Sequence, residues 1–297
     1  WALHLRADMI ALSFVRSASD ADDVRRVMDE EKQWIPVIAK IEKPQAIDNL
    51  DEVIDAFDGF MVARGDLAVE CPLEDVPFLQ KQVIEATRRN AKPVITATQM
   101  LESMISAPRP TRAEASDVAN AVLDGTDAVM LSAETAAGRY PVETVETMAQ
   151  ICTEAEKSDE VMLDRDFLNR TFTRIDQSIA NATLFTAFHL KVKAIASLTD
   201  SGSTALWMSR HNCGCPIFAL TPKIASQRKM ALYRNVYTLF LEQSTDRDEV
   251  LIQAEDALLK KGHVQRGDLI VLTIGEPMGK SGGTNTMKIV RVGELRA

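Results

Sequence analysis

Charged side chains stand at the ends of two apolar runs in the first half of the sequence. Lys40 and Glu42 stand at the end of the run 35–41, and Asp66 follows the run 59–62. If both runs are parallel strands, their carboxyl ends meet at one edge of a sheet, where β/α proteins build active sites. Two carboxylates in one pocket repel unless a cation lies between them, and a lysine beside them favours an anionic substrate. These residue types predict Mg²⁺ with a phosphorylated ligand, and a structural ion-pair network is the alternative.

The elements that must position these residues alternate along the chain. Short apolar runs separated by amphipathic stretches predict parallel β/α units. The runs lie at 9–14, 35–41, 60–62, 93–97 and 128–131. A charged stretch without strand signals, 156–176, predicts a domain boundary, which gives domains 1–157 and 158–297.

The second domain alternates again and predicts a smaller three-layer α/β domain. Its predicted strands lie at 194–198, 217–220, 236–241, 269–274 and 287–292, with helices at 177–189, from 203, near 226 and at 247–261.

Composition narrows the function classes. The chain has 297 residues, 46% of them hydrophobic, and 34 Lys and Arg against 43 Asp and Glu give a net charge of −9. An acidic chain without a basic run is a poor partner for nucleic acid. Neither a signal peptide nor an apolar run of membrane-spanning length stands out, so we expect no membrane contact. Cys213 and Cys215 form C-x-C without a matching His or Cys pair, and free thiols fit a cytoplasmic location.

Six motifs carry a resemblance that covers essentially the whole chain. They are IAKIE at 38–42, MVARGDL at 61–67, TATQMLESM at 96–104, PRPTRAE at 108–114, DVANAV at 117–122 and MLSAET at 130–135. In their order and spacing, the sequence resembles the pyruvate kinase family in its bacterial form. The resemblance implies phosphoryl transfer from phosphoenolpyruvate to ADP, giving pyruvate and ATP in glycolysis. It also implies a TIM-type (β/α) barrel with a lid domain and a carboxy-terminal α/β effector domain.

The resemblance also gives individual residues a role. Glu42 and Asp66 match ligands of the divalent metal, Mg²⁺ or Mn²⁺, and Lys40 matches the catalytic cation that faces the transferring phosphoryl group. Thr98 matches the catalytic hydroxyl near the enolate face, where a proton must be delivered. The residues that match the substrate pocket are Ala63, Arg64, Gly65, Asp66, Thr98, Ser13 and Ser132.

In the second domain, a loop between a strand and a helix offers hydroxyls and amides to a phosphate. The family binds its allosteric effector there and at the loop 279–284, and an ordinary capped loop is the alternative. The residues matched are Thr199, Ser201, Gly202, Ser203, Thr204, Gly282, Gly283 and Thr284. Several relatives that respond to fructose 1,6-bisphosphate carry a lysine where this chain has Asp200. A carboxylate there repels a second phosphate, so the expected effector is a sugar monophosphate or AMP.

The largest departure from the family is at the start, because the sequence opens in what resembles the helix before the fourth barrel strand. About five of the eight βα units are expected, without the lid, the family's nucleotide contacts or its K⁺ site. Three explanations are open: a fragment of a longer gene, a deliberately shortened chain, or a piece that closes by pairing with another copy. The family also suggests a homo-oligomer, in particular a homotetramer.

Two other functions compete with the pyruvate kinase interpretation. The chain could be a non-catalytic module that binds effector and oligomerises. It could also belong to another metal-dependent barrel that uses phosphoenolpyruvate, although the motif at 96–104 and the second domain argue against that class.

Overall fold

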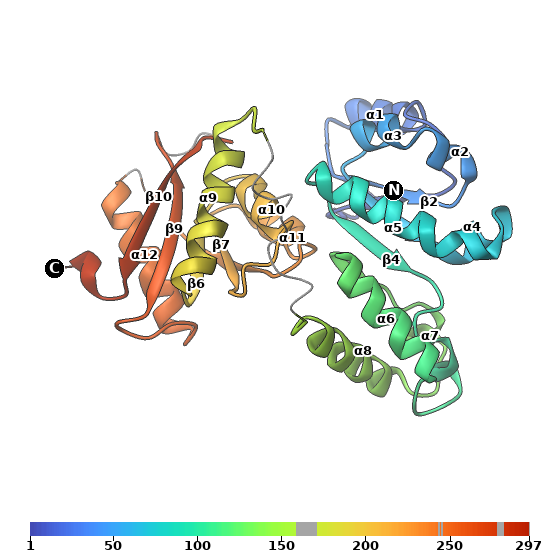
Figure 1. The fold of residues 1–297 in the computed structure, drawn as a ribbon. Coiled ribbons are helices and arrows are strands. Elements are labelled where there is room, and N and C mark those ends of the chain that lie inside the picture. Colours follow the sequence, from blue (N-terminus) through green and yellow to red (C-terminus); the bar gives the residue numbers. More distant parts are fainter. Residues whose placement is uncertain (159–170, 243, 245, 278–281, 297) are drawn as a thin grey trace. The chain divides into compact units, whose positions relative to one another are not determined.

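The strands of the chain form two five-stranded sheets, one in each of two units, Trp1–Val161 and Met162–Ala297 (Figure 1). The computed structural model describes residues 1–158, 171–242, 244, 246–277 and 282–296. The domain boundary predicted between residues 157 and 158 borders a stretch, 159–170, outside the described residues, and it stays a prediction.

In the first unit the strands lie side by side in sequence order, and each pairs in parallel with the next. They are β1 (Ile10–Leu12), β2 (Val37–Ile41), β3 (Gly59–Ala63), β4 (Val94–Ala97) and β5 (Ala128–Val129). All five fall within or next to the apolar runs that predicted them. The predicted succession of parallel βα units is therefore present.

Helices connect these strands. They are α1 (Asp20–Glu31), α2 (Pro44–Asp48), α3 (Leu50–Ala56), α4 (Arg64–Glu70), α5 (Val76–Arg89), α6 (Arg112–Asp124), α7 (Ala133–Ala136) and α8 (Pro141–Ala155), with short 3₁₀ turns η1 (Leu73–Asp75) and η2 (Glu102–Ile105). Val37, Ala39 and Ile41 of β2 are fully buried in one core with residues of α3 and α5. Because side chains alternate along a strand, Lys40 and then Glu42 lie toward the opposite face.

The second unit has three layers, as predicted. Its strands are β6 (Ala194–Leu198), β7 (Ile217–Thr221), β8 (Val236–Phe240), β9 (Leu269–Gly275) and β10 (Thr284–Arg291), in the order β10-β9-β6-β7-β8. Helices α9 (Ile175–Leu190), α10 (Ser203–Ser209) and α11 (Ile224–Met230) share one apolar core with the sheet, and α12 (Arg247–Lys260) shares the other. A short 3₁₀ turn, η5 (Glu294–Arg296), follows β10.

The last strand begins earlier than expected. β10 runs antiparallel to β9, and it begins at Thr284 rather than at residue 287. Thr284 pairs with Gly275 at the end of β9, so this residue belongs to the sheet and not to the loop before it. Residues 279–281 of the predicted effector loop lie outside the described residues.

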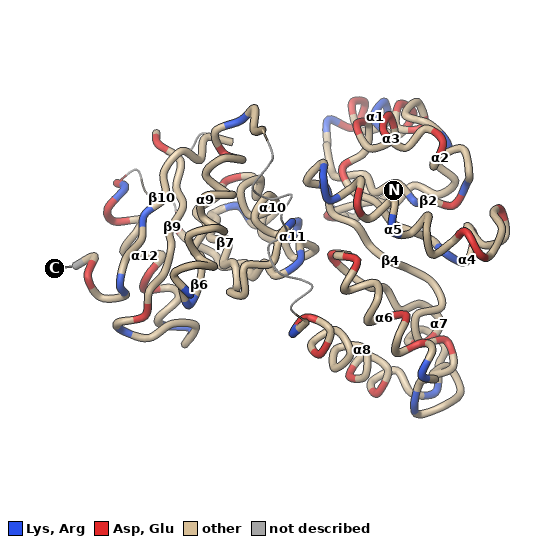
Figure 2. The backbone as a smooth tube through the Cα atoms, viewed as in Figure 1, with Lys and Arg blue, Asp and Glu red and all other residues tan. Residues whose placement is uncertain are grey.

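Charge is mixed over both units. Figure 2 shows Lys and Arg positions interspersed with Asp and Glu positions in each of them. In the part of the chain that the structure describes, no helix has the length and apolar character needed to cross a bilayer.

A capping box fixes the start of α6. The Thr111 hydroxyl accepts the Glu114 amide at 3.2 Å, and the Glu114 carboxylate accepts the Thr111 amide at 2.7 Å. Glu114 also accepts the backbone amide and the hydroxyl of Ser103, at 2.7 and 2.6 Å. Burial alone would raise the pKa of Glu114, but these hydrogen bonds outweigh it and hold the pKa below its ordinary value. One carboxylate thus joins α6 to η2.

We expect Glu114→Gln to remove a pH-dependent part of the stability. Since the folded pKa is depressed, the carboxylate stabilises the fold above its unfolded pKa of about 4.3, and that contribution is lost as the pH falls through the folded value. The difference in melting temperature between wild type and variant should therefore be largest at neutral pH and shrink below about pH 4.3. Glu143→Gln, an exposed carboxylate in the first turn of α8, is the control. A difference that does not change with pH would contradict the role of the charge.

Candidate functional site

Strand register brings the predicted site residues to one edge of the first sheet. Leu12 of β1 pairs with Ala39 of β2, and Ala63 of β3 pairs with Ala97 of β4. Ser13, Arg64 and Thr98 come directly after the ends of β1, β3 and β4, and Lys40 follows Ala39 within β2. The carboxyl ends of the strands therefore place them together, as their spacing predicts.

A buried carboxylate organises this edge. Glu42 is 1% exposed, and its Oε1 lies 2.5 Å from the ammonium of Lys40. Its Oε2 accepts the backbone amide of Phe14 at 2.7 Å, and Lys40 donates to the Ser13 hydroxyl at 3.1 Å. Phe14 adopts a left-handed backbone (φ 58°), which is uncommon for a bulky residue. The ends of β1 and β2 are thus joined through two hydrogen bonds, while the ion pair links Lys40 to Glu42 at the end of β2.

The turn after β4 is strained and meets the start of α4. Thr98 and Gln99 are both left-handed, with φ of 69° and 53°. The Thr98 hydroxyl accepts the Gly65 amide at 2.7 Å and donates to the Ala97 carbonyl at 2.6 Å. It thereby satisfies one of the free amides at the amino end of α4. Thr98 and Gly65, both predicted at the substrate, are in direct contact.

The contacts around Gly65 give no steric reason for a glycine at this position. A Cβ there would lie 3.5 Å from Thr98 atoms, which is an ordinary contact, and its φ is not in the left-handed region. The room that glycine leaves beside this amide is consistent with a molecule that approaches the backbone.

Arg64 is turned toward the scaffold. Its guanidinium donates to the carbonyls of Ala97 (3.2 Å) and Thr98 (2.8 Å) and lies 2.7 Å from the Asp117 carboxylate. A further contact joins it to Gln80 at 3.3 Å. Arg64 therefore holds the strained turn in place, and its predicted contact with substrate stays a prediction. The supports Gln80 and Asp117 were missed, because nothing in their local sequence indicates a partner in another helix.

The two predicted metal ligands differ in their surroundings. Asp66 is exposed in the first turn of α4, and within the described residues its carboxylate makes no hydrogen bond or ion pair. Glu42 is buried and already has Lys40 and the Phe14 amide as partners. No group of three or more His, Cys, Asp or Glu side chains suited to a metal occurs among the residues described. Two carboxylates fit Mg²⁺, which completes its shell with water and substrate phosphate.

The remaining predicted residues lie nearby in the fold. Ala63 is buried at the end of β3. Ser132 is half-buried after β5, where its amide donates to Glu134 at 2.7 Å. Glu134 is 3% exposed and also accepts the Leu101 amide at 3.4 Å, so it joins the end of β5 to the segment after Thr98. In the described residues, no contact links Ser132 to the Lys40 and Glu42 pair.

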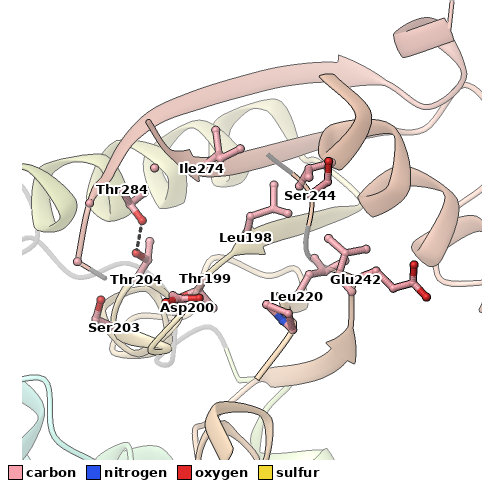
Figure 3. Close-up of a pocket in the computed structure, with 16 residues that line it drawn as sticks. Leu198, Thr199, Asp200, Ser203, Thr204, Leu220, Glu242, Ser244, Ile274 and Thr284 are labelled. Atoms are coloured by element: carbon pink, nitrogen blue, oxygen red, sulfur yellow. Dashed lines mark hydrogen bonds between the residues drawn. The ribbon is translucent and has the colours of Figure 1, made fainter. Parts of the chain in front are cut away.

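A second candidate site is a cavity of about 130 Å³ in the other unit (Figure 3). Of the residues predicted at an effector, those that line it are Thr199, Ser203, Thr204, Gly282, Gly283 and Thr284. The hydroxyls of Thr204 and Thr284 are 2.6 Å apart, which joins α10 to β10. Ser201 and Gly202 do not line the cavity but form the turn before α10. Gly202 is left-handed (φ 85°), and a Cβ there would meet Met230 at 2.6 Å.

The cavity also contains residues that sequence reasoning missed. Glu242 and Ser244 follow β8 and line the cavity. In Figure 3 they lie on one side of Leu198 and Ser203 lies on the other. Their position after a strand was the signal that could have identified them. Asp200 at the mouth is paired with Lys223 at 2.5 Å, so its charge is compensated. Because Lys223 offsets its charge, Asp200 repels a second phosphate less than the sequence suggested.

Comparison with known proteins gives consistent matches. Residues 1–145 match the family model described as pyruvate kinase, barrel domain, and residues 177–290 match that of the pyruvate kinase alpha/beta domain. Curated relatives named pyruvate kinase include those of Sporosarcina psychrophila (45% identity), Geobacillus stearothermophilus (48%) and Mycobacterium tuberculosis (46%). The matches cover 98%, 98% and 99% of this chain, but 50%, 50% and 62% of the relatives. The predicted fold class, part of a barrel followed by an α/β domain, is confirmed.

We expect Lys40→Met to destabilise the first unit, because it leaves the buried Glu42 carboxylate without its cation. The expected loss in free energy of unfolding is roughly 1–3 kcal/mol, measured by urea denaturation. Adding Glu42→Gln should recover part of it, since no uncompensated charge remains buried.

The control is Lys81→Met, which breaks the ion pair between Lys81 and Asp124. The Lys81 side chain is more exposed than that of Lys40. Its expected loss is about 0–1 kcal/mol. Equal losses for the two lysine variants, with no recovery in the double variant, would rule out this dependence of Glu42 on Lys40.

Proposed function

Since the chain belongs to the pyruvate kinase family, we propose that it provides the metal and phosphoenolpyruvate site of an enzyme that transfers phosphoryl to ADP. The chain spans about half the length of several curated relatives it matches, so this activity is proposed for the protein as a whole. The observation that carries the proposal is the pair of Lys40 with a buried Glu42 at the end of β2, while Asp66 stands in the first turn of α4, directly after the neighbouring strand β3.

Glu42 and Asp66 would hold the divalent metal, Mg²⁺ or Mn²⁺. When bound, such an ion neutralises charge on the phosphoryl oxygens and orients them. Lys40 is placed to exchange its contact with Glu42 for a phosphoryl oxygen, because its ammonium already lies at the edge of the sheet. Positioning and charge neutralisation are what phosphoryl transfer chiefly requires.

Thr98 and Gly65 would bind the other end of phosphoenolpyruvate. Their hydroxyl and amide point at each other, and a substrate carboxylate can take the place of one partner at this helix start. The Thr98 hydroxyl would then stand at the enolate face, where pyruvate formation needs a proton. Arg64 acts by holding the Thr98 turn. We assign no residue of the described chain to ADP or K⁺.

We also propose that the protein is a homotetramer in the cytoplasm, following the family resemblance. Val142 and Val145 on α8 are 64% and 53% exposed, and apolar side chains of this kind suit a subunit contact.

Asp66→Asn should abolish turnover, because a neutral amide is a poor ligand for Mg²⁺. Removing a group that only supports a metal ligand lowers metal affinity or activity by about 10–100-fold. Loss of a direct ligand should therefore lower turnover by at least about 100-fold. The assay follows pyruvate formed from phosphoenolpyruvate and ADP with Mg²⁺ through lactate dehydrogenase. It is run on this chain and on a chimera in which the Mycobacterium tuberculosis relative supplies the segment that precedes the match.

The control is Glu74→Gln, an exposed carboxylate in η1, which should leave turnover unchanged. Pyruvate release that needs no ADP would indicate another class of phosphoenolpyruvate enzyme. A chimera that folds but turns nothing over would favour the non-catalytic module.

For the second site we propose a regulatory phosphate monoester, a sugar monophosphate or AMP. Thr199, Ser203 and Thr204 line the cavity at the start of α10, and a helix start favours an anion, which would compete with Thr199 and Ser201 for the Gly202 and Ser203 amides. Lys223 could leave Asp200 for a phosphate, which supplies one cation. The exposed Glu242 adds a negative charge to the wall of the cavity, which would disfavour a second phosphate.

AMP should raise the melting temperature of the second unit. At a free concentration about 100 times its dissociation constant, a ligand raises the free energy of unfolding by about 2.7 kcal/mol. Ser203→Asp should abolish the shift by placing a negative charge in the cavity, while Ser178→Asp, an exposed position on α9, should leave it intact. Calorimetry with fructose 1,6-bisphosphate provides the comparison, and binding tighter than that of AMP would contradict the monoester.

A further inference from the structure

Two thiols face each other in the loop that joins α10 to β7. The Sγ atoms of Cys213 and Cys215 are 3.4 Å apart, and the residues are only 4% and 6% exposed. Both cysteines are free in this structure. A disulfide requires an S–S distance of about 2.05 Å, so the sulfur atoms need to approach by roughly 1.3 Å. They are held close to bonding distance inside an apolar core.

We propose that Cys213 and Cys215 are a redox modification site, which hydrogen peroxide oxidises to a disulfide and a dithiol reductant returns to two thiols by thiol–disulfide exchange. The Cys213 thiolate attacks the peroxide, the S–O bond forms and the O–O bond breaks, and the leaving hydroxide takes the proton that the thiol released, which gives a sulfenic acid and water. The Cys215 sulfur then attacks the Cys213 sulfur, so that the S–S bond forms, the S–O bond breaks and a second water leaves. In total, two thiols and hydrogen peroxide give one disulfide and two waters.

The residue between the cysteines allows this closure. Gly214 is left-handed (φ 76°), and no atom lies within 4 Å of the place where a Cβ would be. Its amide donates to Asn212 Oδ1 at 2.9 Å, and Asn235 donates to the Cys215 carbonyl at the same distance. Hydrogen bonds to Asn212 and from Asn235 therefore hold the two ends of the cysteine loop, while the open space around Gly214 lets its backbone dihedral angles change. Gly214 is also exposed, which brings a small oxidant next to the buried thiols.

The two thiols are not equivalent. The hydrogen bond from the Cys215 thiol lowers the pKa of Cys213 by more than burial raises it. The same hydrogen bond, together with burial, raises the pKa of Cys215. Since the thiolate is the nucleophile, Cys213 attacks first and Cys215 resolves the sulfenic acid.

The site suits a reversible modification more than a structural one. A loop closed across a single residue removes little chain entropy, so the disulfide adds little stability. Breaking the disulfide again therefore costs the fold little, as a reversible modification requires. A metal is a poorer explanation, because a structural zinc site takes four ligands and no group of three candidate ligands exists among the described residues.

The modification would act on a segment that connects two walls of the cavity. α10 contributes Ser203 and Thr204 at its amino end, and β7 contributes Leu220 near its carboxyl end. The cysteine loop joins the other ends of these two elements.

The decisive measurement uses the unmodified chain, so it does not depend on a variant that folds. The reduced chain is treated with hydrogen peroxide, catalase removes the peroxide, and the chain is then denatured, labelled with N-ethylmaleimide and digested with trypsin without reductant. The segment 211–223, between Arg210 and Lys223, contains both cysteines. We expect this peptide to lose about 2 Da and take no label, and dithiothreitol before labelling to restore two labels.

Cys71 and Cys152 are the internal controls, since each is the single cysteine of its tryptic peptide. In Cys215→Ser, Cys213 should instead be trapped as a sulfenic acid by dimedone. Two results would overturn the proposal: both labels retained on 211–223 at a peroxide dose that oxidises Cys71 or Cys152, or a disulfide that forms only when peroxide is added in urea.

Discussion

A carboxylate buried to 1% exposure must find its partners inside the protein, and Glu42 determines in this way how the mouth of the first sheet is built. The Lys40 ammonium and the Phe14 amide satisfy its two oxygens, and they come from different strands. The Phe14 amide reaches Glu42 because Phe14 adopts a left-handed backbone. This conformation is unfavourable for a residue other than glycine, and the surrounding contacts must hold it. The same arrangement holds a cation and a carboxylate at the edge where a phosphorylated substrate would bind.

Strain recurs at the neighbouring strand end, and it has a visible support. Thr98 and Gln99 are both left-handed, although neither is glycine. Arg64 stabilises this turn through the Ala97 and Thr98 carbonyls, while Asp117 holds the guanidinium from α6. Strained residues that the surrounding structure holds in place are concentrated at functional sites, because the strain fixes a hydroxyl or amide in one direction. Here the fixed group is the Thr98 hydroxyl, aimed at the start of α4.

The second unit uses strand ends in the same way but with a different chemistry. Hydroxyls and amides replace the lysine and carboxylate pair, and the Thr204 to Thr284 contact joins segments 80 residues apart. Two carboxylates line its cavity: Asp200, which is paired with Lys223, and Glu242. They favour a ligand rich in hydroxyl groups over one with several negative charges. Its two cysteines lie beyond the opposite end of α10, so the cavity and the thiols occupy different ends of the same elements.

The sequence by itself determined the succession of parallel βα units in the first unit and the positions of the strands in the second, apart from the start of β10. Apolar runs and side-chain alternation are local properties, and the predicted strand 194–198 has the same bounds as β6. Motif resemblance also indicated the family and the residues of both sites. Tertiary structure alone decided that Phe14 reaches Glu42, that Arg64 supports a turn, and that Lys223 neutralises Asp200. These contacts join positions 23–34 residues apart, and their geometry depends on how whole elements pack rather than on any local pattern.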